Sequence, residues 1–168
     1  MSVGNGHIVA VRTDDSIWTW GYKGAGQLGS AAVSTGVGNV PQQVGTDTNW
    51  REVSAASHSA AMRTDGTLWT WSDNYLGQLG DGTTMARRVP GQLGTATDWQ
   101  SLSAGVNMLA IRTSGTLWAW GANFNGGLGD GTPFSRFSPV PIGTATWLRV
   151  AVGEAHALTI RIDGTLWT

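Results

Sequence analysis

The stretch Arg63-Thr64-Asp65-Gly66-Thr67-Leu68-Trp69-Thr70-Trp71 occurs four times along the chain in closely similar form. Its first Trp recurs at a nearly constant spacing: 51 residues separate Trp18 from Trp69, and Trp118 and Trp167 follow at intervals of 49. A period of about 50 residues is typical of solenoids and propellers, in which each repeat is one supersecondary unit. The sequence therefore predicts a repeat array.

Each copy of this stretch is typical of a β-hairpin. Asp65-Gly66 and Asp163-Gly164 tolerate the positive φ that both central positions of a two-residue turn require. In the first copy Asp15 replaces this Gly, so we expect a looser turn there. Apolar residues before the turn alternate with a period of two, as in a half-buried strand; the pairs are Val9 and Val11, Ala60 and Met62, Leu109 and Ile111, and Leu158 and Ile160.

On the outgoing arm of the hairpin, Trp69 and Trp71 share one face, while Leu68 and Thr70 share the other. We therefore expect the Trp pairs to form a layer between neighbouring units. A Gly-rich turn follows each complete hairpin, and Gly provides backbone conformations that other residues reach only with strain. The predicted structural repeat positions are Trp18, Trp20, Trp69, Trp71, Trp118, Trp120, Gly26, Gly29, Gly77, Gly80, Gly126 and Gly129.

Each unit also contains a Pro four residues before a Gly, followed by a Trp that opens a short segment typical of a strand; these Trp residues are Trp50, Trp99 and Trp147. This segment, one more strand after an irregular loop and the two hairpin arms give about four strands per unit. Four strands per blade is the arrangement of β-propellers.

The composition excludes several classes of partner. Only 12% of the residues are charged and the net charge is −1, so the sequence predicts no basic surface for nucleic acid or an anionic membrane. The chain has no Cys, which excludes disulfides and thiolate chemistry without fixing the compartment. No apolar run approaches the roughly 20 residues that span a bilayer, and residues 1–6 do not resemble a secretory signal. The localisation stays open.

No pattern of reactive residues points to catalysis. One repeat position holds His in three units, which is more typical of a structural residue than of a catalytic one: His7, His58 and His156. The Arg residues that open the hairpin stretches are expected to bond carbonyls or carboxylates near the turn: Arg12, Arg63, Arg112 and Arg161. The Asp residues beside the Gly-rich turns lack the ligand order of a calcium loop. We therefore predict no enzyme activity, no cofactor and no metal site.

Several motifs keep their order over three periods, as in Val53-Ser54-Ala55, His58, Asn74, Gly77-Gln78-Leu79-Gly80-Asp81-Gly82 and Pro90. This pattern resembles the repeat of the regulator of chromosome condensation family, in a Trp-rich form similar to bacterial tandem versions. The resemblance implies an all-β fold, a β-propeller of which this chain forms about three four-stranded blades plus a fourth hairpin.

The repeat units of this single array are expected at about 1–50, 51–99 and 100–148, with a partial unit at 149–168. The resemblance implies a ring of seven blades, so we expect either a fragment of a longer propeller or an open arc. Exposed edge strands invite pairing with another chain. Self-association through the open edges is therefore expected.

Loops carried on a rigid repeat scaffold are the usual sites of recognition. Three irregular segments, 30–40, 81–89 and 130–138, differ between units in length and chemistry. We predict a non-catalytic scaffold that binds a protein partner through these loops on one face. Because interface hot spots favour Arg and aromatic residues, the candidate binding residues are Arg87, Arg88, Phe134, Arg136 and Phe137.

Three alternatives to this function stay open. The irregular loops are simply free to vary, or the chain is a structural repeat array on a cell surface. The third alternative is guanine-nucleotide exchange on a small GTPase, which the resemblance implies because the founding family member performs it.

Overall fold

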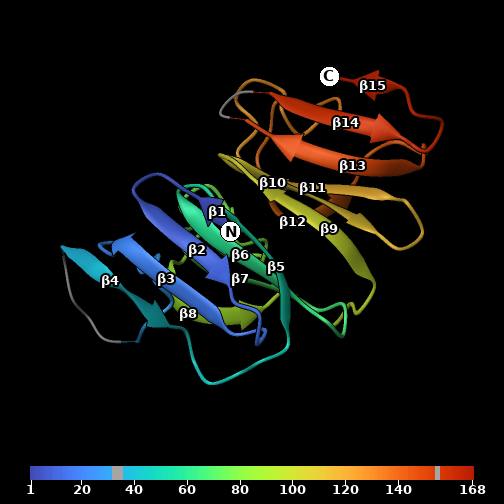
Figure 1. Ribbon diagram of the computed structural model, residues 1–168. Helices are drawn as coiled ribbons and strands as arrows, with labels where there is room; N and C mark the ends of the chain where they lie inside the picture. The colour runs from blue at the N-terminus through green and yellow to red at the C-terminus, as the bar shows by residue number, and fades with distance from the viewer. Residues whose placement is uncertain (32–35, 154–155) are drawn as a thin grey trace.

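The computed structural model describes residues 1–31, 36–153 and 156–168, so residues 32–35 of the irregular segment 30–40 lie outside it. Every regular element in the described residues is a β-strand, and the strands form four antiparallel sheets (Figure 1). None of these residues belongs to a helix that could cross a membrane. The all-β fold expected from the sequence is confirmed.

Three of the sheets have four strands in sequential order, and the fourth has three. The fourth unit is therefore more than the expected hairpin, because the strand that opens at Trp147 joins it. The first sheet contains β1 (Ser2–Val3), β2 (His7–Val11), β3 (Ile17–Tyr22) and β4 (Val37–Gln43). The second contains β5 (Trp50–Ala55), β6 (His58–Arg63), β7 (Leu68–Ser72) and β8 (Arg87–Gln92). The third contains β9 (Trp99–Ala104), β10 (Asn107–Arg112), β11 (Leu117–Gly121) and β12 (Arg136–Pro141), and the fourth contains β13 (Trp147–Val152), β14 (Ala157–Arg161) and β15 (Leu166–Trp167).

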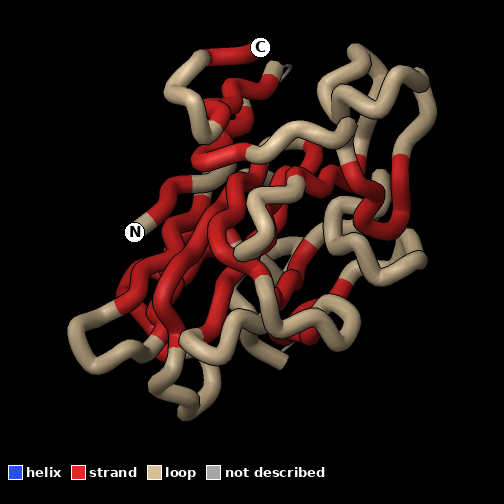
Figure 2. Tube along the Cα trace, turned by 90° about the vertical axis from the view of Figure 1, so that its right-hand side faces the viewer, coloured by secondary structure: helices blue, strands red, loops and turns tan. Residues whose placement is uncertain are grey.

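The sheets pack against one another in chain order, with the first and the fourth at opposite ends of the stack (Figure 1). Figure 2 shows the same strands and the loops that join them in a view turned by 90°. The strand that opens each sheet packs against the opening strand of the next. Serine hydroxyls join these strands: Ser2 accepts from the Ala55 amide at 3.0 Å, and Ser54 accepts from the Ala104 amide at 2.9 Å. Ser103 repeats the contact with Val152 at 2.9 Å. Each bridge satisfies an amide that the sheet itself leaves unpaired.

A separate apolar core fills each of the three seams between consecutive sheets. The first combines Val9 and Ile17 of the first sheet with Ala61 and Trp71 of the second. The other two seams are built from the corresponding positions of the later sheets. The middle strands of the second and third sheets therefore have one face toward the preceding sheet and one toward the following sheet, which explains why β6 and β10 are buried along nearly their whole length.

The Trp pairs form the expected layer in these seams. The indole of Trp71 inserts beside Gly29 of the preceding sheet and donates from Nε1 to the Gln27 carbonyl at 2.9 Å. Trp120 repeats this contact one unit later, with the Gln78 carbonyl at 3.0 Å. Gly is required at the turn because a Cβ on Gly29, which has a φ of +68°, would lie 2.8 Å from Val44 Cγ1.

The hairpin turns differ from the predicted two-residue type. The Gly66 amide donates to the Arg63 carbonyl at 3.1 Å, and only Gly66 of the central residues has a positive φ, +79°. This is a three-residue loop in which a type I turn ends on a left-handed residue. Asp15 occupies the left-handed position of the first copy with a φ of +58° and makes the same bond at 3.0 Å, so the expected looser turn was wrong.

Candidate protein-interaction surface

The loop between β7 and β8, residues 73–86, is held in shape by one buried amide side chain. Asn74 Nδ2 donates to the carbonyls of Thr83 at 3.1 Å and Met85 at 3.0 Å. Its Oδ1 accepts from the Leu79 amide at 2.9 Å. A loop fixed at both ends by the same residue loses little conformational freedom on binding.

The loop between β11 and β12, residues 122–135, repeats this arrangement one period later. Asn123 Nδ2 donates to the carbonyls of Thr132 at 2.7 Å and Phe134 at 3.2 Å, and Oδ1 accepts from the Leu128 amide at 3.0 Å. Because both loops connect the same two strands of neighbouring sheets, they leave their sheets at the same end.

Two of the predicted binding residues brace these loops from within. Arg87 pairs with Asp81 at 2.8 Å, and Arg136 pairs with Asp130 at 2.7 Å. Partial burial raises the pKa of Asp81, but hydrogen bonds from Thr83 and the Arg87 charge outweigh it, so the pKa of this carboxyl lies below its usual value. The same balance lowers the pKa of Asp130. Both guanidinium groups are thus engaged inside the loops.

The other three predicted residues lie in two different places. Arg88 and Phe137 occupy equivalent positions on β8 and β12, where they pack against the Gly-rich turn of the preceding unit. A Cβ on Gly77 would lie 2.4 Å from Phe137 Cδ1, and one on Gly26 would lie 2.9 Å from the Arg88 Cα. Phe134, in contrast, projects from its loop into solvent. The structure therefore does not gather the five residues into one patch.

Each loop presents two large apolar side chains at matching repeat positions. Tyr75 is 79% exposed and Met85 75%, while Phe124 is 71% and Phe134 68% exposed. Tyr75 and Phe124 directly follow the anchoring Asn, whereas Met85 and Phe134 have their carbonyls bound to it. We call these four residues the loop surface. Sequence reasoning missed Tyr75 and Phe124, although their spacing of 49 residues was a readable signal.

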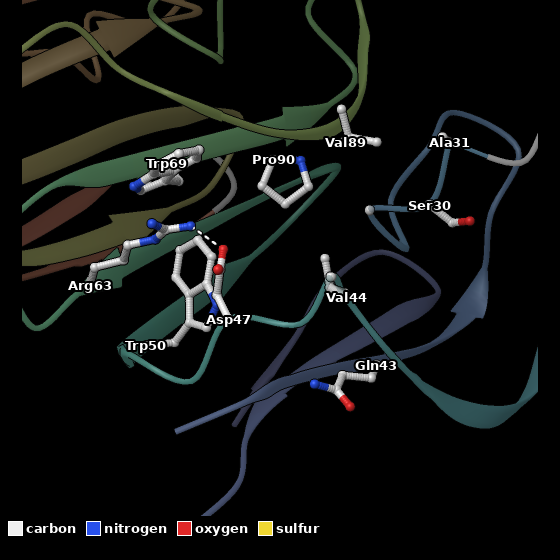
Figure 3. Close-up of a pocket in the computed structure, with 12 residues that line it drawn as sticks. Ser30, Ala31, Gln43, Val44, Asp47, Trp50, Arg63, Trp69, Val89 and Pro90 are labelled. Atoms are coloured by element: carbon white, nitrogen blue, oxygen red, sulfur yellow. Dashed lines mark hydrogen bonds and ion pairs between the residues drawn. The ribbon is translucent and has the colours of Figure 1, made fainter. Parts of the chain in front are cut away.

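A cavity of about 370 Å³ lies in the first seam, near the hairpin end of the sheets (Figure 3). One wall holds Arg63, whose guanidinium carbon lies 4.4 Å from the ring centre of Trp50 and 4.0 Å from that of Trp69. Arg63 also pairs with Asp47, as expected for a carboxylate near the turn. Stacking between two indoles was not expected, and it recurs at Arg112 and Arg161. These charges are engaged within the molecule, which favours a structural role for this wall.

The repeated histidines are buried in the scaffold. His7 Nε2 lies 2.8 Å from Ser59 Oγ, which donates to the Gln27 carbonyl at 3.0 Å. Burial lowers the pKa of His7 to about 4. Burial and, to a smaller extent, the nearby His7 lower the pKa of His58 to about 3. A substrate cannot reach the Ser59 hydroxyl, which is fully enclosed. In residues 1–31, 36–153 and 156–168, no group of three His, Asp or Glu is placed to hold a metal ion.

Comparison with known proteins agrees with this architecture. A family model described as the regulator of chromosome condensation (RCC1) repeat matches residues 114–160, and a second model of the same description matches residues 56–78. The RCC2 homolog of Danio rerio is 29% identical over 77 residues, which are 45% of this chain and 16% of that protein.

Solved structures share the arrangement of the sheets. Prp20p from Saccharomyces cerevisiae superimposes with a TM-score of 0.85 at 21% identity, over 94% of this chain and 42% of Prp20p. Human WBSCR16 gives a TM-score of 0.83 at 24% identity, over 95% of this chain and 43% of that protein. The chain thus spans less than half the length of these structures. The two repeat matches, at residues 56–78 and 114–160, support the regulator of chromosome condensation repeat family, and the solved structures share the fold.

Proposed function

We propose that this chain is a non-catalytic scaffold that binds a protein partner through the loop surface, Tyr75, Met85, Phe124 and Phe134. The observation that carries the proposal is the repetition of two solvent-exposed apolar side chains on two loops that are already rigid. Exposed apolar clusters rimmed by polar groups are typical of protein-binding sites. Aromatic anchors on preorganised backbone supply contact area at a small entropic cost.

Proteins of similar fold support a protein partner. The structure of Prp20p is described together with its binding to Gsp1p and histones. A second structure shows yeast RCC1 (Prp20) bound to Kap60. Gsp1p, histones and Kap60 are partners of Prp20p, which shares less than 25% identity with this chain. The partner proposed here is therefore defined by its chemistry: it presents an apolar patch flanked by polar groups.

The test begins with a photo-reactive amino acid at position 124 or 134, which captures a partner from extracts of the source cell. The same label at Ile162, an exposed apolar residue in the turn between β14 and β15, is the matched control. We expect one partner at both loop positions and not at the control. Serine at all four loop-surface positions should then weaken binding of that partner at least tenfold. Unchanged affinity would overturn the proposal.

Guanine-nucleotide exchange is the second candidate. It is favoured by the fold shared with Prp20p, a protein whose structure is described together with its binding to Gsp1p. A nucleotide-release assay with a panel of small GTPases separates it from passive binding. Accelerated release would favour exchange. A structural cell-surface array is distinguished by the capture experiment, because such an array predicts no common partner at positions 124 and 134.

A further inference from the structure

The cavity in the first seam has no part in the proposed function (Figure 3). All of its lining residues lie between positions 29 and 90, so neither end of the chain borders it. Val44 and Asp47, from the segment that links β4 to β5, line it together with Arg63 and Trp69 of the second sheet. None of the four loop-surface residues lines it, so the cavity is a separate site.

The sequence departs from its own repeat at two positions that line this cavity. Val44 stands where the second unit has Leu93. Asp47 stands where the second and third units have Ala96 and Ala145. Leu93 and Ala96 both pack in the core of the second seam, whereas the Asp47 side chain is 54% exposed. The first seam thus replaces two side chains that fill a core with a shorter side chain and a carboxylate.

The Asp47 carboxylate has acceptor capacity left after its pairing with Arg63. Its Oδ2 accepts from Arg63 Nη2, while Oδ1 has no hydrogen bond to any residue that the structure describes. A carboxylate offers about four lone-pair sites to donors. Beside it, the indole of Trp69 lines the cavity and is partly exposed. The cavity therefore combines an acceptor for hydrogen bonds with an aromatic surface.

The charges around the cavity disfavour an ionic ligand. An anion would lie against the exposed carboxylate of Asp47. A cation would compete with the guanidinium of Arg63, which already lies 4.4 Å from the ring centre of Trp50 and 4.0 Å from that of Trp69. A purely apolar ligand would bury Asp47 without donors. The chemistry that remains is a neutral ligand that carries hydroxyl groups.

Sugar rings have both of the surfaces that this cavity matches. Their hydroxyl groups donate to a carboxylate, and the C–H groups on a face of the ring form an apolar surface that can pack on an indole. The volume of about 370 Å³ also lies within the range of roughly 300–1,000 Å³ typical of small-molecule sites.

We propose that this cavity binds a neutral carbohydrate. Hydroxyl groups of the sugar donate to Asp47 Oδ1, and the C–H face of one ring packs on Trp69. Arg63 keeps its structural place between the indoles and holds Asp47 in position through Oδ2. The site is thus preorganised before the sugar binds.

The test is saturation-transfer NMR of the whole chain with the methyl glycosides of glucose, galactose and mannose. At least one glycoside should receive saturation on its ring C–H protons. Asp47→Ala, which installs the residue of the next unit, should weaken its binding about tenfold. The matched control is Asp98→Ala, which removes the carboxylate beside Arg112 in the second unit and should leave binding unchanged.

Val44→Leu is the second variant, because it installs the larger residue of the next unit in the cavity wall. It should also weaken sugar binding, while urea denaturation should show a fold at least as stable as that of the wild type. Circular dichroism shows whether Asp47→Ala is folded, and Val44→Leu alone decides if it is not.

Three outcomes overturn the proposal: no saturation of any of the three glycosides, unchanged binding in Asp47→Ala, or stronger signals from choline or glucuronate than from the neutral sugars. Serine at the four loop-surface positions should not alter sugar binding. This proposal and the proposed function therefore fail separately.

Discussion

The substitution His58→Leu tests whether the buried histidine makes the stability of the fold depend on pH. His58 is fully buried, and neither of its ring nitrogens has a hydrogen-bond partner in the described residues. His7 sits at the same repeat position one unit earlier and reaches Ser59 of the next sheet. One unit later the residue equivalent to Ser59 is Met108, which has no hydroxyl to offer His58. Burial, followed by the nearby His7, lowers the pKa of His58 from 6.5 to about 3.

The sign follows from the protons that each state binds. Below pH 6.5 the unfolded chain protonates His58, whereas the folded chain keeps it neutral until the pH approaches its folded pKa of about 3. The free energy of unfolding is therefore not reduced by His58 above pH 6.5, and it falls as the pH drops below that value. From pH 6.5 to pH 4.5, at about 1.4 kcal/mol per unit, His58 removes about 3 kcal/mol from the free energy of unfolding.

Urea denaturation of both proteins at pH 7.5 and 4.5, followed by Trp fluorescence, measures the effect. The wild type should lose about 3 kcal/mol more than His58→Leu over this range, because His7 and the carboxylates contribute equally to both. The variant should also be at least as stable as the wild type at pH 7.5, since it removes an unsatisfied buried polar ring. Equal losses in the two proteins would refute the reasoning.

Three further substitutions test the scaffold. Trp71→Phe should lower the free energy of unfolding by about 2 kcal/mol, through the lost Nε1 hydrogen bond and the smaller ring. Trp20→Phe, at the matching position of the first sheet where the indole is partly exposed, should cost clearly less; urea denaturation of the pair checks this. Asn74→Ala should cost about 2 kcal/mol, because it leaves loop carbonyls unpaired, and should speed proteolysis within 73–86, which mass spectrometry of limited digests detects. Ser54→Ala should cost about 1 kcal/mol through the lost bridge between opening strands, and it should shift the thermal midpoint downward in calorimetry.

The repeat scaffold was predictable because each of its motifs occurs three or four times in the sequence. The period-two alternation of apolar residues predicted the strands, and the Trp pairs predicted the layer between sheets. Because Trp20, Trp71 and Trp120 stand at one repeat position, each copy supported the same prediction. The hairpin loop was less predictable. Asp-Gly suits both a two-residue turn and the last two positions of a three-residue loop, and the choice depends on the strand register, which the local sequence does not contain.

The bridges between sheets were missed for a different reason. Ser54 and Ser103 bond the amide of a strand about 50 residues away, and a single Ser in a strand carries no local sign of such a partner. The stacking of Arg63 between two indoles was missed for the same reason: Trp50 comes from the strand before and Trp69 from the strand after. Both contacts are products of packing, not of local propensity.

The candidate site was only partly predictable. Arg and aromatic residues in the loops suggested binding, but the pairing of Arg87 with Asp81 engages the former within its loop. The equal spacing of Asp81–Arg87 and Asp130–Arg136 was the signal for a structural brace. Partner binding by the five candidate residues stays a prediction: Arg87, Arg88, Phe134, Arg136 and Phe137.

Hydrogen–deuterium exchange of the chain with and without its captured partner tests the central claim most directly. Binding through the loop surface predicts slower exchange in residues 73–86 and 122–135, with the hairpin loops at 64–66 and 113–115, at the opposite end of the sheets, unchanged. Protection of the hairpin loops with no change in 73–86 and 122–135 would contradict the account, because it would place the partner at the other end of the scaffold.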